Sequence, residues 1–168
     1  MSATIELPGI GHYQLSEPKN FQRPIALLQS RVMYAAAHVV ADRNADNSEG
    51  SPPVIDWDST LAFREHLWSW GLGVAEAMDT AQRGMGLDWE TTRELIVRSL
   101  AASKSCGGSI VCGAGTDQLP APYNQYQLED VIRAYEEQMD FVESHNGSAV
   151  LMASRALAAV AKNTDDYA

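Results

Sequence analysis

Residues 74–84 read Val-Ala-Glu-Ala-Met-Asp-Thr-Ala-Gln-Arg-Gly, a short apolar run that ends in a polar cluster. Buried parallel strands have nearly continuous apolar sequences because other structure covers both of their faces. In parallel α/β folds, polar groups for binding and chemistry follow the carboxyl ends of the strands. This stretch therefore predicts a buried strand over residues 72–78 that leads into a functional loop.

Three further apolar runs lie at 32–39, 109–115 and 149–154, so that a run recurs about every 36 to 40 residues. Each run is followed by a helix signal, which is the order of consecutive parallel βαβ units. We expect residues 31–168 to be α/β, forming the first four βα units of a (β/α)8 TIM barrel. A complete barrel takes about 250 residues, and this chain has room for only four βα units. We therefore expect the remainder of the barrel to be missing from the chain. The alternative is a compact, open four-stranded α/β domain.

Helix boundaries are marked by capping residues. Asp56 is placed to cap a helix that reaches Gly71, and Asp88 to cap a helix from Trp89 to about Ser103. A third helix follows Gln127, and its predicted apolar stripe consists of Leu128, Val131, Ile132, Tyr135, Met139 and Val142. The loops after the strands are longer than those before them, which places the chemistry at the carboxyl edge of the sheet.

Residues 1–30 are rich in Pro, Gly and Gln and predict an extended N-terminal arm. The chain has 22 acidic and 12 basic side chains, a formal charge of −10, which disfavours nucleic acid and anionic membranes as partners. No signal peptide or run long enough to span a membrane is evident, so we expect a cytoplasmic protein. Cys106 and Cys112 are expected to be reduced thiols.

Polar residues follow each predicted strand and would share one mouth in a closed barrel. They are His38 and Asp42 after the first strand, Asp79, Thr80, Gln82 and Arg83 after the second, Thr116, Asp117 and Gln118 after the third, and Ser154 and Arg155 after the fourth. The competing interpretation is local turn formation and helix capping, for which Asp and Thr are suited.

Two titratable residues occupy unusual positions in the predicted strands. His38 ends an apolar run, where a neutral imidazole can act as a general base, a metal ligand or a structural hydrogen-bonding group. Glu76 is in mid-strand, and a buried carboxylate must be paired, protonated or functional. We predict no metal ion and no cofactor, and keep as an alternative a metal-dependent barrel enzyme that uses His38, Glu76 and Asp79.

The segments 73–82, 87–96 and 112–116 resemble the second strand, its Gly-Thr-Thr-Gly-Glu motif, the following helix and the glycine-rich third strand of dihydrodipicolinate synthase-like lyases. The chain is most similar to an uncharacterised branch of that superfamily, over about residues 31–160. The resemblance implies a barrel in which a lysine on the sixth strand forms a Schiff base with a 2-oxo acid. It also implies a carbon–carbon lyase acting on a small carbonyl substrate, inactive as this chain alone.

The motif carries over in part. Thr80 matches its second threonine, Asp79 stands at the first threonine, and Gln82 stands at the glutamate. Asp79 would repel a bound carboxylate unless it is protonated or paired, and Arg83 is the candidate partner. The predicted catalytic residues are Thr80, Asp79, His38 and Glu76, and the predicted substrate-binding residues are Gln82, Arg83, Thr116, Asp117, Ser154 and Arg155.

Half a barrel leaves two strand edges and one core face uncovered. We therefore expect a homo-oligomer, or pairing with the missing half of the barrel. A non-catalytic fragment or interaction protein is the remaining alternative.

Overall fold

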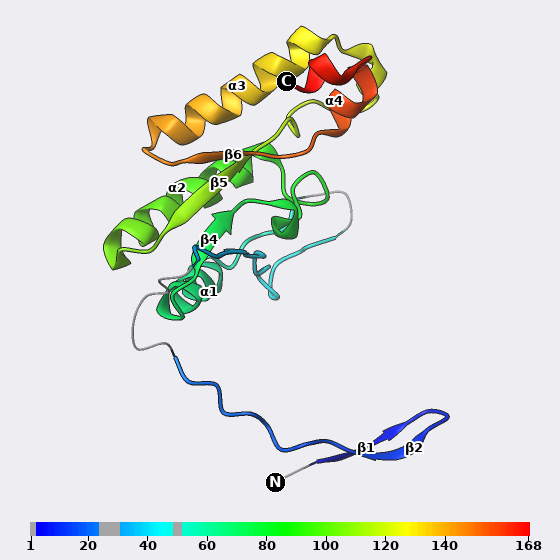
Figure 1. Ribbon diagram of the computed structural model, residues 1–168, viewed down its shortest axis with the longest axis vertical. Helices are drawn as coiled ribbons and strands as arrows, with labels where there is room; N and C mark the ends of the chain where they lie inside the picture. Colours follow the sequence, from blue (N-terminus) through cyan, green and yellow to red (C-terminus); the bar gives the residue numbers. More distant parts are fainter. Residues whose placement is uncertain (1–2, 24–30, 49–51) are drawn as a thin grey trace.

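The short apolar runs form one parallel sheet. In the computed structural model, which describes residues 3–23, 31–48 and 52–168, the sheet has four strands in the order β3-β4-β5-β6 (Figure 1). Their bounds are Tyr34–Ala36 for β3, Gly73–Glu76 for β4, Ile110–Ala114 for β5 and Ala149–Leu151 for β6. All three pairings are parallel, which confirms the predicted sheet, although each strand is shorter than its apolar run.

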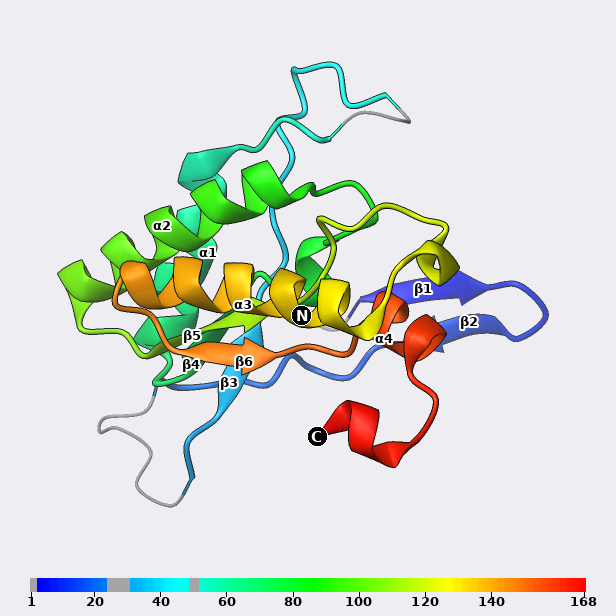
Figure 2. The same cartoon turned by 90° about the horizontal axis from the view of Figure 1, so that it is seen from above.

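Helices connect successive strands and begin where the sequence places their caps. They are α1 (Trp57–Ser69), α2 (Trp89–Cys106) and α3 (Leu128–Ser144). The carboxylates of Asp56 and Asp88 accept hydrogen bonds from the backbone N–H groups of Ser59 and Thr91. Figure 2 shows these helices on the same side of the sheet. Each strand is thus added beside the preceding one, always at the same edge of the sheet, and the helices that connect them all lie on one face.

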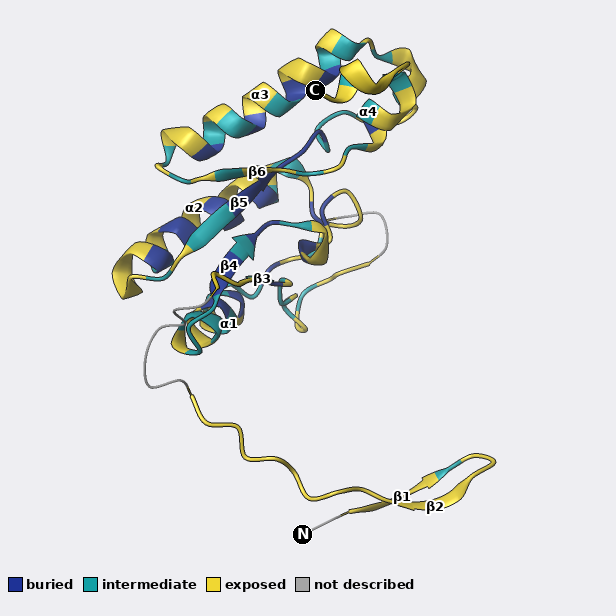
Figure 3. Ribbon diagram, viewed as in Figure 1, coloured by how far each residue is buried: buried dark blue, intermediate teal, exposed yellow. Residues whose placement is uncertain are grey.

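The sheet is buried mainly in its two central strands and on its helix-facing side. Figure 3 shows the buried residues of the sheet in β4 and β5, whereas the residues of β3 and β6 are intermediate or exposed. Val74, Glu76 and Cys112 alternate onto the helix-facing side and are fully buried. On the opposite side, Tyr34 is 43% exposed and Val150 is 37% exposed, and no helix of the described residues covers them.

The N-terminal arm differs from the predicted extended segment because it contains a hairpin. Strands β1 (Thr4–Leu7) and β2 (Gly11–Gln14) pair antiparallel, with Gly9 in the left-handed region at φ 78° in the turn between them. The hairpin lies away from the sheet in Figure 1. The described part of the arm ends at Arg23, and residues 1–2 and 24–30 lie outside the described residues.

The apolar stripe of α3 also differs from the prediction. Its buried residues are Val131, Ala134, Gln138 and Val142, whereas Ile132 is 46% exposed. Beyond β6 the chain forms the short helix α4 (Arg155–Val160) and a final turn, η3 (Thr164–Tyr167). None of the helices in the described ranges combines the length and apolar character that a transmembrane helix needs.

Candidate functional site

A cavity of about 80 Å³ lies beyond the carboxyl ends of β4, β5 and β6. Six of the predicted site residues line it: Asp79, Arg83, Thr116, Asp117, Ser154 and Arg155. They follow three successive strands and are up to 76 positions apart in sequence (79 to 155). The parallel arrangement therefore brings together groups that the sequence keeps apart.

The loop after β4 turns sharply because two residues other than glycine adopt left-handed conformations. Ala77 has φ 53° and Gln82 has φ 63°, on either side of the short 3-10 helix η1 (Asp79–Ala81). Such conformations are unfavourable for residues with a Cβ and persist where surrounding contacts impose them. The turn ends the strand alternation at Glu76 and directs residues 79–83 toward the cavity.

Arg83 anchors this loop. Its side chain is 2% exposed; Nη1 donates to the carbonyl oxygens of Ala77 (3.0 Å) and Gly113 (2.7 Å). Its Nη2 lies 2.5 Å from Asp117 Oδ1, and the sequence-based pairing of Arg83 with Asp79 is therefore wrong. The charge of Arg83 is already compensated, so Arg83 builds the cavity wall.

Gln138, a residue that the sequence analysis missed, completes this network from α3. Its Oε1 accepts from Arg83 Nη2 (2.5 Å) and from the N–H of Gly115 (2.7 Å). Its Nε2 donates to Asp117 Oδ1 (3.0 Å) and to Gln118 Oε1 (2.6 Å), so all four hydrogen-bonding positions of the amide are used. The sequence did contain a signal for this residue, because Gln138 lies at helical spacing from Val131 and Val142 and therefore on the same buried face of the helix.

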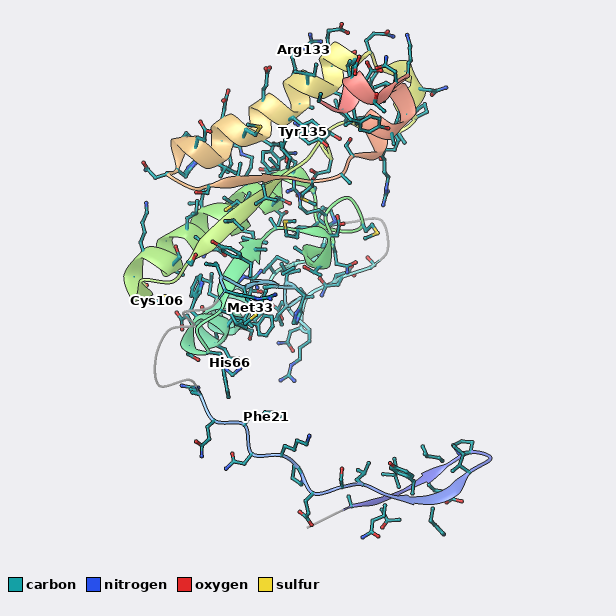
Figure 4. All side chains as sticks on the ribbon, viewed as in Figure 1. Phe21, Met33, His66, Cys106, Arg133 and Tyr135 are labelled. Atoms are coloured by element: carbon teal, nitrogen blue, oxygen red, sulfur yellow. The ribbon has the colours of Figure 1, made fainter. Side chains whose placement is uncertain are left out.

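The loops after β5 and β6 are joined across the cavity. The hydroxyl oxygens of Thr116 and Ser154 are 2.5 Å apart, and Ser154 Oγ accepts the N–H of Leu157 to cap α4. Tyr135 points from α3 toward β6 (Figure 4) and donates to the carbonyl of Met152 at 2.5 Å. Burial raises the pKa of Tyr135, and a hydrogen bond with Ser154 opposes this shift.

A close approach explains the glycine in β5. A Cβ added at Gly113 would lie 2.5 Å from Met152 Sδ and 2.9 Å from the carbonyl oxygen of Ala77. Gly113 therefore lets the segments after β4 and β6 close over the strand. The glycine at this position of β5 therefore serves close packing.

Asp79 and Arg155 are the uncompensated charges of the cavity. Both side chains are exposed, and neither has a hydrogen-bond or ion-pair partner in the part of the chain that the structure describes. Arg83 and Asp117, by contrast, neutralise each other. Counting only the described residues that line it, the cavity therefore offers one unpaired cation and one unpaired carboxylate to a ligand.

Glu76 lies outside the cavity, on the helix-facing side of β4. Its carboxylate is fully buried and receives both Arg64 Nε and Arg64 Nη2 at 2.8 Å, as well as the N–H of Ala77. The Nη1 of Arg64 donates to the carbonyls of His38 and Thr60. The sequence left three alternatives for Glu76: paired, protonated or functional. The structure shows the paired one, and the partner is Arg64 of α1, which the sequence analysis overlooked.

The other predicted site residues do not reach the cavity. The imidazole of His38 is exposed, with its ring centroid 4.7 Å from that of Phe63. Thr80 is exposed and its hydroxyl lies 3.4 Å from the carbonyl of Ala37, while Gln82 lines a neighbouring groove. Asp42 accepts the N–H of Asn44 in a local turn.

The structure does not assemble the metal site considered from the sequence. Both carboxylate oxygens of Glu76 are bonded to Arg64, so His38, Glu76 and Asp79 do not form one donor set. Across residues 3–23, 31–48 and 52–168, no three His, Cys, Asp or Glu side chains are grouped to hold a metal ion.

The two cysteines are free thiols in different surroundings. Cys106 is exposed at the end of α2, whereas Cys112 is buried in β5. Burial, assisted by the negative charge of Glu76, raises the pKa of Cys112 to about 12, and the positive charge of Arg83 opposes this shift. The Cys112 thiol is therefore protonated at neutral pH and is a packing residue.

Comparison with curated proteins finds no match to this chain. A protein-family comparison does find one, to the family described as protein of unknown function (DUF993), over residues 5–168. The match includes all of the hairpin except Thr4, the whole sheet and every residue of the cavity. Because it spans nearly the whole sequence, the chain belongs to the DUF993 family, an uncharacterised domain family.

Proposed function

We propose that this chain is one half of a (β/α)8 barrel of the dihydrodipicolinate synthase-like type. In this proposal it supplies part of the active site of an aldolase-type carbon–carbon lyase that acts on a 2-oxo acid or a related carbonyl compound. The observation that carries the proposal is the cavity at the carboxyl edge of the sheet, where Asp79, Thr116 and Arg155 converge from three successive strands. Barrel enzymes place their substrates at this edge.

The strand order supports a barrel over a doubly wound sheet. In a doubly wound sheet the strand order reverses and helices cover both faces. Here the order β3-β4-β5-β6 is sequential and α1, α2 and α3 lie on one face. The uncovered face carries Tyr34 and Val150, apolar groups suited to the side-chain-filled interior of a barrel.

In this proposal the two unpaired charges of the cavity have different roles, Arg155 in binding and Asp79 in proton transfer. The guanidinium of Arg155 binds the carboxylate of the substrate, since paired N–H donors match carboxylate geometry. Asp79 accepts or returns the proton on the carbon next to the carbonyl group, as a positioned general base and acid. Asp79 and Arg155 both line the cavity, so the positive charge of Arg155 offsets the repulsion between Asp79 and the substrate carboxylate.

The Schiff-base lysine of such an enzyme is not supplied by the lysines of this chain. Lys19 lies in the arm, Lys104 near the end of α2 and Lys162 beyond α4, and all three belong to the described residues. None lines the cavity. In this proposal the amine comes from the completing half of the barrel, where it condenses with the carbonyl group and releases water.

Binding of pyruvate tests the role of Arg155. We expect calorimetric titration of the chain to show pyruvate binding that Arg155→Met weakens at least about tenfold, because the carboxylate loses its charged partner. Arg133→Met is the matched control, because it removes an exposed arginine of α3 that pairs only with Asp130 among the described residues. Equal binding by the Arg155 variant and the unmodified chain would contradict the proposal.

Trapping tests the reaction class in the full natural protein. Incubation with pyruvate and borohydride should reduce the imine to a stable secondary amine on one lysine, located by peptide mass spectrometry. Asp79→Asn should slow exchange of the pyruvate methyl protons with solvent and still permit trapping. If no 2-oxo acid leaves an adduct, the lyase assignment fails.

A further inference from the structure

A wide groove of about 920 Å³ adjoins the cavity and shares Gly84 and Asp117 with it as common walls. Its apolar surface comes mainly from Pro52 and Pro53 after the first strand and from Met85 and Trp89 after the second; Leu87 also lines the groove but is buried. The cavity is the smaller of the two and has Arg155 in its wall, so it suits the carboxylate of a ligand, whereas the groove has the volume of a small-molecule site.

We propose that the groove binds the apolar tail of the same 2-oxo acid whose carboxylate occupies the cavity. The substrate class is accordingly a 2-oxo acid with an aromatic or branched apolar side chain. This inference rests on the proposed function, and it adds the part of the substrate that determines specificity.

One wall of the groove is held rigidly. The rings of Trp89 and Phe141 pack in a T-shaped arrangement with their centroids 5.6 Å apart, and the Trp89 indole N–H donates to Glu137 Oε1 at 3.3 Å. The guanidinium of Arg83 lies 5.5 Å from the Trp89 ring centroid, which connects this wall to the cavity network. Leu87 is 1% exposed, so its position is set by the core.

The two loops that form the groove approach each other at Gly86. A Cβ built there would lie 3.8 Å from Pro53 Cδ, and Gly86 has φ 135°, which a residue with a side chain rarely adopts. The backbone hydrogen bond from Asp42 N to Val54 O, 2.7 Å long, ties the proline loop to the segment after β3.

Met85 is the adaptable part of the groove. Its side chain is 55% exposed, and a flexible thioether chain can fold over ligands of different shape. Because Met85 lines the groove and not the cavity, it affects the tail of a ligand and not its carboxylate. It is therefore the residue with which the inference can be tested.

The experiment compares pyruvate with 2-oxo-4-phenylbutanoate by calorimetric titration of the chain. We expect the phenyl compound to bind at least about tenfold more tightly than pyruvate and Met85→Asp to abolish this preference; the ratio of the two affinities is the readout, because the added carboxylate repels both anions. Ile132→Asp is the matched control, since Ile132 is 46% exposed on α3, outside the groove and cavity. Equal unfolding midpoints of the two variants would confirm that both are folded.

Failure of this inference is distinguishable from failure of the proposed function. If both acids bind with equal affinity through Arg155, or if Met85→Asp retains the preference, the groove does not hold the tail and the inference is overturned. If neither acid binds, or if Arg155→Met changes nothing, the proposed function itself is wrong.

Discussion

Arg64 and Glu76 form an ion pair in which both side chains are 0% exposed, between α1 and β4. Removing two charges from water is costly, and the pair persists because each group also hydrogen-bonds to the backbone. The ion pair lies on the helix-facing side of the sheet, away from the cavity. Its role is to position α1 on the sheet.

Loss of one partner of this pair should be strongly destabilising. We expect Glu76→Leu to lower the free energy of unfolding by about 3–5 kcal/mol, because it leaves the Arg64 guanidinium buried without a counterion. The double variant with Arg64→Met should lose less stability than Glu76→Leu alone. Urea unfolding measures both effects.

A surface ion pair provides the control. Glu94→Gln breaks the exposed Arg98–Glu94 pair of α2 and should change the free energy of unfolding by only about 0.5 kcal/mol. Additive losses from Arg64→Met and Glu76→Leu would show that the two groups do not interact as the structure indicates.

At the level of elements, α3 is oriented by a narrow stripe that includes a polar residue. Val131, Ala134 and Val142 pack against the sheet, and Gln138 lies among them with its amide fully hydrogen-bonded. The helix thereby holds the loops after β4 and β5 in place. An error of one position in the stripe would turn Gln138 away from Arg83.

Neighbouring residues of α3 should therefore respond very differently to truncation. We expect Val131→Ala to cost about 1.5–3 kcal/mol, because it removes buried methyl groups and leaves a cavity. Ile132→Ala should cost less than about 1 kcal/mol, because Ile132 is 46% exposed. Denaturant unfolding of the two variants checks the orientation of the helix, and similar losses would contradict it.

For the whole molecule, the open face of the sheet is the surface best suited to association with another chain. Tyr34 and Val150 are exposed there, and the outer edges of β3 and β6 lack strand partners among the described residues. Exposed apolar faces and free edges favour association. We propose that a second copy of the chain or a complementary half-barrel covers them.

Sedimentation of the chain over a range of concentrations tests this proposal. We expect reversible association that Val150→Lys weakens, since a charge on an edge strand opposes pairing. Val97→Lys is a matched control, because Val97 is also 37% exposed but lies on α2. A chain that stays monomeric at all concentrations would argue against the proposal.

The sheet and the helices were predictable because their signals are local. Asp56 and Asp88 cap helices within three residues of the groups that they bind. The apolar runs located the strands of the sheet, but the hairpin at 4–14 escaped prediction because each of its strands has only four residues, too few for a clear alternation of apolar and polar side chains. The exposed position of Ile132 escaped because periodicity alone does not fix which residue at the margin of a stripe is buried.

Sequence by itself determined the parallel α/β order, the helix starts and the gathering of polar residues at one edge of the sheet. Only the tertiary structure decided which of those residues are free to bind a ligand. Arg83 pairs with Asp117, 34 positions away, and Glu76 pairs with Arg64, 12 positions away. The first pair depends on which strands are neighbours in the sheet and the second on how α1 packs on it, and short-range patterns encode neither. That packing leaves Asp79 and Arg155 as the cavity charges without a partner among the described residues.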